Sequence, residues 1–355
     1  MSRDRRSKIK DQRPRNILMI RLDRIGDVLL STPAIKAVRE ACPESYIAFM
    51  VRPYAFDVVK GNPYLNEVIV YDKKGSEKGI IGNLRLSARL RKKRFDLAIV
   101  LHPTQRSHII AYLAGIQHRL GYDRKMGFLL TKRVPHTKQL GLKHEIDYTL
   151  GLLRYIGIES CDKALYIPLS DECERRVNTL FAQNGITNED LVVTVNAGAS
   201  CPSKRWPPEM YGQVCDNLSN EFNAKIVLIS DKKDKVFADK VALMMGRPSV
   251  NLSDMTSIGD LASILRRTRL FISNDSGPVH IACAVGTPVI SIFGRSNRGL
   301  TPARWGPSGS RDVVLHKDVG CEVCLAHNCK LGFKCLKAIT VKDVLEAAKK
   351  ILTPR

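Results

Sequence analysis

Three short stretches of this 355-residue chain combine residue types that could do chemistry. The first is RLDRIGDVLLSTP at 21–33, in which Asp27 follows a glycine where an apolar run gives way to a helical pattern. The helix dipole and free N–H groups favour a carboxylate at a helix start, so a structural role explains Asp27 as well as a functional one. The functional interpretation is a general base that points into a cleft. The stretch is not GxGxxG, which disfavours a dinucleotide site.

The second stretch is NAGASCPSKRWP at 196–207, in which small residues are followed by two cations and a tryptophan. Small residues expose backbone N–H groups, and Lys204 or Arg205 could neutralise a phosphate. The alternative is an ordinary loop between a strand and a helix, with both cations on the surface. We favour the phosphate site.

The third stretch, SNDSGPVHIACA at 273–284, gives the sharpest pattern. Asp275 ends an expected strand, and Ser276 and Pro278 are good residues for a helix start. The N–H groups of a first helical turn bind anions, which suits a diphosphate. His280 lies one turn further on, where a structural histidine and a ligand-facing one are equally plausible.

Strand patterns that alternate with helical patterns must position these stretches. The chain shows this alternation twice, which predicts parallel βαβ units and two doubly wound α/β domains. In such domains the ligand cleft lies at the carboxyl ends of the strands. The strands are expected at 17–22, 46–51, 67–71, 96–101, 191–196, 225–230, 270–274 and 289–293, and the helices at 28–42, 84–94, 171–184, 208–222, 258–266 and 341–352. The expected division is a basic disordered tail at 1–14, domains at 15–175 and 176–340, and a C-terminal helix at 341–355.

The charge balance restricts the kind of partner. Fifty-seven Lys and Arg against thirty-five Asp and Glu leave a net charge of +22, which favours nucleic acid, an anionic membrane or a phosphorylated glycolipid. No signature of a nucleic-acid module is present, so we expect no nucleic-acid partner.

The sequence predicts no membrane span, because it contains no run of about eighteen apolar residues. The basic first fifteen residues lack the apolar segment of a secretory signal and are expected to be a solvated tail or a weak lipid tether. The basic run 89–94 is expected to be solvated or membrane-facing.

Ten cysteines without an export signal indicate reduced thiols. Four of them crowd together in a Cys-x2-Cys-x4-Cys-x5-Cys pattern, at Cys321, Cys324, Cys329 and Cys335. Four thiolates are enough for zinc, but the second gap is unlike that of paired zinc knuckles. Free thiols or a disulfide are favoured over a structural metal, and we expect no cofactor.

Two of the stretches carry a family resemblance. IRLDRIGDVLLSTPAIKAVRE and NDSGPVHIACAVGTPVISIFG resemble the signatures of the ADP-heptose:lipopolysaccharide heptosyltransferases, glycosyltransferase family 9, of the heptosyltransferase II/III type. KRWP and NLSDMTSIGDLASIL fall at matching intervals, and the similarity spans roughly residues 15–345. The resemblance implies a GT-B fold with two facing Rossmann-like domains, an acceptor-binding amino-terminal domain, and an inverting reaction without a metal.

The resemblance also implies roles for individual residues. Asp27 corresponds to the general base, and Lys204 to the lysine that binds the diphosphate. The other residues implied for the donor are Asp234 at the ribose, Thr256 at the adenine, Ser200 and Ser276 in the donor loops, and Asp275, Gly277 and His280 along the sugar and diphosphate. At Ala199-Ser200 this sequence departs from the family, which often has threonines there. Arg52, Arg106 and Arg119 are the candidates for the acceptor.

The expected function is transfer of heptose from ADP-L-glycero-D-manno-heptose to the lipopolysaccharide inner core. The expected partners are this donor, a Kdo–lipid A or heptosylated core acceptor, and the anionic surface of a Gram-negative inner membrane, where the protein would be cytoplasmic and peripheral. One alternative is a GT-B transferase that uses another sugar nucleotide or a non-lipopolysaccharide acceptor. A basic nucleic-acid-binding Rossmann protein is the other, and the three interlocking motifs disfavour it.

Overall fold

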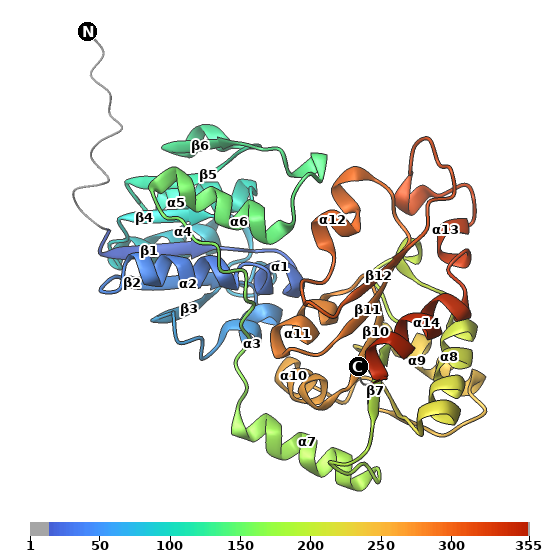
Figure 1. Cartoon of the computed structure of the whole chain (residues 1–355). Coiled ribbons are helices and arrows are strands. Elements are labelled where there is room, and N and C mark those ends of the chain that lie inside the picture. Colours follow the sequence, from blue (N-terminus) through green and yellow to red (C-terminus); the bar gives the residue numbers. More distant parts are fainter. Residues whose placement is uncertain (1–13, 354–355) are drawn as a thin grey trace. The chain divides into compact units, whose positions relative to one another are not determined.

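The structure, a computed structural model, describes residues 14–353. The tail expected at 1–14 lies outside this range except for its last residue. The described chain forms two compact units (Figure 1). The first unit contains the chain up to Gln139 and Glu145–Pro168, and the second contains Leu140–His144 and the chain from Leu169 onward. The chain therefore passes from one unit to the other three times.

The first unit is built on a six-stranded parallel sheet with the order β3-β2-β1-β4-β5-β6. Its strands are β1 (Asn16–Ile20), β2 (Tyr46–Val51), β3 (Glu67–Val70), β4 (Leu97–Val100), β5 (His118–Asp123) and β6 (Lys132–Pro135). The chain runs outward from β1 to β3 and then returns to β4 on the other side of β1. The direction of winding thus reverses between β1 and β4, which is where open α/β sheets bind ligands.

Short connections and helices link these strands. They are α1 (Ile25–Leu29), α2 (Thr32–Ala41), η1 (Pro53–Ala55), α3 (Phe56–Val59), α4 (Gly79–Lys92), α5 (Gln105–Leu113), η2 (Gly127–Leu129), η3 (Lys138–Leu140), α6 (Glu145–Leu153) and η4 (Arg154–Ile156). The helix expected up to residue 42 is interrupted between α1 and α2. Pro33 explains the break, because proline fits the first turn of a new helix and not a helix interior.

The second unit repeats the plan with the strand order β12-β11-β10-β7-β8-β9. Its strands are β7 (Val192–Asn196), β8 (Lys225–Leu228), β9 (Ser249–Asn251), β10 (Leu270–Asn274), β11 (Val289–Phe293) and β12 (Val313–His316). Its helices are α7 (Asp171–Gln183), η5 (Pro202–Lys204), α8 (Pro208–Phe222), α9 (Lys235–Met244), α10 (Ile258–Arg267), α11 (Gly277–Val285), η6 (Arg298–Leu300), α12 (Pro302–Trp305), η7 (Ala326–Asn328), α13 (Lys334–Lys337) and α14 (Val341–Leu352). Here the winding reverses between β7 and β10.

The expected α/β class with parallel sheets is confirmed, and the eight expected strands are present. Four outer strands, β5, β6, β9 and β12, were not expected. The structure places α7 in the second unit, whereas the sequence assigned residues 15–175 to the first. Arg176 of α7 explains this, since its Nε donates to Asp260 of α10 over 3.0 Å. The expected C-terminal helix is α14, whose Val344 and Ala348 are fully buried in the core of the second unit.

Candidate active site

A buried network of charged side chains lies where β1 and β4 of the first unit end. Arg21 follows β1 directly and is 0% exposed. Its Nε donates to Asp23 Oδ1 over 2.7 Å, and its Nη2 donates to Asp27 Oδ1 over 3.0 Å. Asp27 occupies the first turn of α1, as the sequence predicts. One guanidinium therefore fixes both carboxylates that follow the first strand.

The network extends to residues far along the chain. Nη2 of Arg21 also donates to Glu145 Oε1 over 3.0 Å, and Lys138 Nζ lies 2.6 Å from the same oxygen. Glu145 and Lys138 are 0% and 1% exposed. We call Arg21, Asp23, Asp27, Lys138 and Glu145 the carboxylate network. It contains three acids and two bases, so its net charge is −1 when all five side chains are ionised.

Burial, together with the charges of this network, controls the protonation of Asp27. Burial raises the pKa of Asp27 to about 6, the negative charge of Asp23 adds to the rise, and Arg21 opposes it. Asp27 nevertheless keeps 14% of its side-chain surface exposed. A carboxyl group with a raised pKa and an open face can take up a proton from a bound molecule.

His102, just beyond β4, borders the network. Its Nδ1 lies 3.3 Å from Asp23 Oδ2, and its side chain is 35% exposed. Burial lowers the pKa of His102 to about 3, and Arg21 contributes to the fall. The imidazole is therefore neutral near pH 7 and adds no compensating positive charge.

Four cations lie in the segments that follow β2, β3 and β4. Arg52 follows β2, Lys73 and Lys74 follow β3, and Arg106 lies in the first turn of α5. The charge of Arg52 is the chief cause of a lowered pKa of Lys73, and Arg106 and Lys74 add to it, so Lys73 lies within electrostatic range of the other three. Among the described residues, Arg52 Nε is buried without a hydrogen-bond partner. This four-cation group is equipped to hold an anion.

Arg119 lies apart from that group. It is on β5 opposite Ala98, near the amino end of the sheet. Its Nε donates to the carbonyl of Leu129 over 2.7 Å, and its guanidinium stacks 5.4 Å from the centre of the Tyr112 ring. The structure thus brings Arg52 and Arg106 together and leaves Arg119 bound to backbone carbonyls elsewhere.

The second unit holds a buried two-cation cluster where β7, β10 and β11 end. Lys204 Nζ lies 2.9 Å from Asp275 Oδ2, and Arg295 Nη2 lies 2.7 Å from the same oxygen. All three residues are less than 10% exposed. Burial lowers the pKa of Lys204, and the charge of Asp275 opposes that fall. Two cations on one carboxylate leave a positive charge for a further anion, and Arg295 Nε is buried without a partner in the described part of the chain.

The start of α11 lies beside this cluster, directly after Asp275. Ser276 is its N-cap with an extended backbone, and its hydroxyl accepts from Asn196 Nδ2 over 3.0 Å. The first turn starts at Gly277, so its N–H groups add to an anion site. Burial lowers the pKa of His280 to about 3, so this imidazole is neutral, and its Nδ1 is buried with no partner in residues 14–353.

A second group of the predicted residues surrounds the loop after β7. Arg205 Nη2 lies 3.4 Å from Asp234 Oδ1. A Cβ on Gly198 would lie 2.7 Å from that of Asp234, so only glycine permits this close approach. Ser200 is exposed at the end of the loop, and Thr256 is half-buried in the connection from β9 to α10. The structure gives no contact between Thr256 and the two-cation cluster.

Comparisons with known proteins identify the family. The model for glycosyltransferase family 9 (heptosyltransferase) matches residues 83–334. The chain belongs to this family. It also resembles a glycosyl transferase family 9 protein from Veillonella parvula whose crystal structure is known. The two sequences are 27% identical, and the two structures superpose with a TM-score of 0.86 over 95% of this chain and 97% of that one.

Two further relatives agree with this assignment. The lipopolysaccharide core heptosyltransferase OpsX of Haemophilus influenzae is 23% identical over 85% of this chain and 84% of its own length. The E. coli ADP-heptose lipopolysaccharide heptosyltransferase II shares the fold, with 22% identity and a TM-score of 0.78 over 95% of this chain and 98% of that one. The expected GT-B fold is therefore confirmed, and the chain is a glycosyltransferase.

Four charged residues of this family 9 glycosyltransferase escaped sequence reasoning. Arg21 directly follows β1 and Arg295 lies two residues beyond the end of β11, which is a local signal that could have found them. Glu145 carries no such signal, because it meets Arg21 from more than 100 positions away in the chain, and Lys138 joins the network through Glu145.

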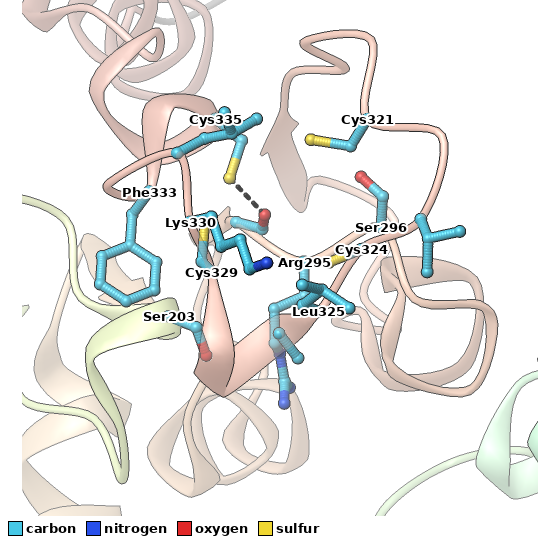
Figure 2. A pocket seen from close by; sticks show the side chains of 14 residues that line it. Ser203, Arg295, Ser296, Cys321, Cys324, Leu325, Cys329, Lys330, Phe333 and Cys335 are labelled. Atoms are coloured by element: carbon cyan, nitrogen blue, oxygen red, sulfur yellow. Dashed lines mark hydrogen bonds between the residues drawn. The ribbon is translucent and has the colours of Figure 1, made fainter.

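The four clustered cysteines line a cavity of about 150 Å³ in the second unit (Figure 2). Cys335 donates to the carbonyl of Gly294, and all four thiols are free. Within residues 14–353, no group of three or more His, Cys, Asp or Glu is arranged to hold a metal ion. No helix in the same range is long and apolar enough to cross a bilayer.

Proposed function

We propose that this enzyme transfers heptose from ADP-L-glycero-D-manno-heptose to the inner core of lipopolysaccharide, with inversion at the anomeric carbon. The functions named for its relatives OpsX and heptosyltransferase II support this substrate class. The observation that carries the chemical part is the position of Asp27, a partly exposed carboxyl with a pKa of about 6 at the reversal point of the first sheet.

Asp27 is proposed as the general base. Its carboxylate removes the proton from the acceptor hydroxyl as that oxygen attacks the anomeric carbon of the donor. The bond between that carbon and the diphosphate breaks in the same step, so ADP leaves and the proton stays on Asp27. A single displacement of this kind inverts the anomeric configuration.

The two-cation cluster is proposed to hold the diphosphate. Lys204 and Arg295 together exceed the charge of Asp275 by one, and the N–H groups that open α11 point to the same anion. Cations and a helix start stabilise charge that grows on a leaving diphosphate, so this cluster can meet that need without a metal ion. Gly277 and His280 border the sugar and the diphosphate in this proposal.

The nucleoside end of the donor is proposed to lie along the loops after β7, β8 and β9. Asp234 is assigned to the ribose, Thr256 to the adenine, and Ser200 and Ser276 to polar contacts of the donor. Gly198 leaves the backbone close to Asp234, which keeps this part of the loop free of side chains.

The acceptor is proposed to be a Kdo–lipid A or heptosylated core, held through its carboxylates and phosphates. Arg52 and Arg106 of the four-cation group supply the charge, with Lys73 and Lys74 beside them. Arg119 contributes less to this proposal, because backbone carbonyls already engage its guanidinium. An enzyme with such an acceptor would work at the cytoplasmic face of the inner membrane as a peripheral protein.

Transfer assays test the proposal. The purified enzyme is incubated with ADP-heptose and with Kdo-terminated or heptose-terminated core acceptors from which the acyl chains have been removed, and the linkage of the product is determined by NMR. We expect one acceptor to be glycosylated with inverted configuration. Turnover with another sugar nucleotide and none with ADP-heptose would instead support the alternative GT-B transferase.

A further inference from the structure

Helix α4 of the first unit presents apolar side chains to solvent. Ile80 is 80% exposed, Ile81 66% and Leu84 49%. Residues three and four positions apart share a helix face, so these three form one patch on the first turns of α4. The helix packs into the unit through its other side, at Gly82, Leu86, Ser87 and Leu90.

The same helix is strongly basic. Residues 78–94 contain seven Lys and Arg and no Asp or Glu. Arg85 and Lys92 are exposed, whereas Arg89 and Lys93 form ion pairs with Glu77 and Glu67. An apolar patch bordered by cations is typical of helices that lie in the headgroup layer of a bilayer, where long basic side chains reach lipid phosphates while their stems cover apolar surface.

The position of α4 agrees with such a surface. The connection from β3 to α4 carries Lys73 and Lys74, two members of the four-cation group. Under the function proposed above, on which this step rests, that group holds the polar part of a lipid-anchored acceptor. The apolar turn of α4 therefore follows closely on the residues that would hold a substrate whose acyl chains are in the bilayer.

We propose that α4 is the surface through which the enzyme binds an anionic lipid bilayer. Ile80, Ile81 and Leu84 enter the headgroup layer, and Arg85 and Lys92 contact lipid phosphates. An anionic bilayer is the occupant that satisfies both the apolar patch and the seven cations of residues 78–94, two of which form ion pairs. The surface acts in recruitment and takes no part in the transfer step.

Vesicle binding by the full chain tests this surface. Co-sedimentation is measured with vesicles of phosphatidylcholine alone and with vesicles that also contain phosphatidylglycerol, for wild type and for the double variant I80D/I81D. The matched control is L243D/M244D on α9 of the second unit, where Leu243 is 80% and Met244 53% exposed. Transfer to a deacylated, water-soluble acceptor is measured for all three proteins as a check on folding and catalysis.

We expect wild type and L243D/M244D to bind the anionic vesicles equally, and I80D/I81D to bind them at least ten-fold more weakly. Higher salt should weaken binding of the wild type, and transfer to the soluble acceptor should be unchanged in every variant. Equal binding by I80D/I81D, or an equal loss in L243D/M244D, would overturn the proposal. So would a protein that binds no vesicles but forms a dimer that I80D/I81D dissociates, which would identify α4 as a self-association surface. A failure of transfer in the wild type would count against the proposed function and leave the vesicle result unaffected.

Discussion

At the residue scale, the protonation of Asp27 connects catalysis with stability. Its pKa is raised from 3.8 to about 6, so the folded protein binds the proton more tightly than the unfolded chain does. Stability from this group is present at low pH and is lost as the pH rises through about 6. At pH 8 the buried charge therefore destabilises the fold, and the same charge is what the proposed reaction uses.

Replacing Asp27 with Asn separates these two effects. Asp27→Asn should lower kcat by roughly 10²- to 10⁴-fold, the range for loss of a general base, and leave ADP binding intact. It should also raise the free energy of unfolding at pH 8 by on the order of 1 to 3 kcal/mol, because one uncompensated buried charge is removed. Kinetics, calorimetry with ADP and urea unfolding measure the three quantities. A variant that is inactive and also unfolded would contradict the assignment of this charge.

The pH dependence of the reaction follows from the same value. The base must be ionised to act, so kcat/KM should fall tenfold for each pH unit below about 6 and reach a plateau above it. His102 and His280 should not add a limb in this range, since burial lowers the pKa of each to about 3. The measurement is a pH–rate profile from pH 5 to 9 with a non-titrating acceptor. A profile flat down to pH 5 would exclude a base of this pKa.

At the element scale, the carboxylate network joins β1 to α6. Arg21 ends the apolar run of β1, and Glu145 opens α6, so one buried ion pair links the first strand of the unit to its last helix. Removing the base of a buried ion pair typically costs about 3–5 kcal/mol, because the acid is left without compensation, and Arg21 is the base for three acids. The position of α1 and Asp27 thus depends on an element from far along the chain.

Glu145→Gln tests whether this link also tunes the base. The charge of Glu145 raises the pKa of Asp27, so its removal should move the acidic limb of the pH–rate profile to lower pH, by roughly half a unit to one unit. The matched control is Glu77→Gln, which removes a buried acid of the same unit outside the network. A purely structural role for Glu145 would lower activity equally at all pH values and leave the limb in place.

The elements also show what could be predicted from the sequence. The eight expected strands are short apolar runs bounded by turn residues, and this pattern indicates a buried strand. The edge strand β6 (KRVP) is short and polar, because an edge strand buries less side-chain surface, and β5 (HRLGYD) beside it also lacks an apolar run. Asp27, Lys204 and His280 could be proposed from the sequence because each lies in the loop or helix that follows an apolar strand. Glu145 was not found, because its partner Arg21 is brought to it only by the fold.

At the scale of the whole molecule, the proposed donor residues and the proposed base lie in different units. ADP should therefore slow hydrogen exchange in segments of the second unit. Hydrogen–deuterium exchange with saturating ADP should show protection of residues 196–206 and 275–281 in the second unit, because a ligand stabilises the conformation that it binds. Lys204→Met should reduce that protection, and Lys36→Met, in the first unit, should not. Protection confined to residues 22–30 of the first unit would place the nucleotide in the wrong unit for the proposed function.

The threefold passage of the chain between the units has a consequence for recombination. The segment Leu140–His144 belongs to the second unit, where the His144 ring is hydrogen-bonded to the carbonyl of Gly306 over 3.0 Å, yet it lies within the sequence of the first. Gly141 has a positive φ of 63° and is packed so tightly that a Cβ would lie 1.8 Å from the Arg298 carbonyl oxygen. A hybrid enzyme with a single junction, after residue 168, would therefore take these five residues from one parent and the rest of the second unit, which they contact, from the other. Exchange of donor specificity between relatives requires that this short segment be inherited together with the second half of the chain.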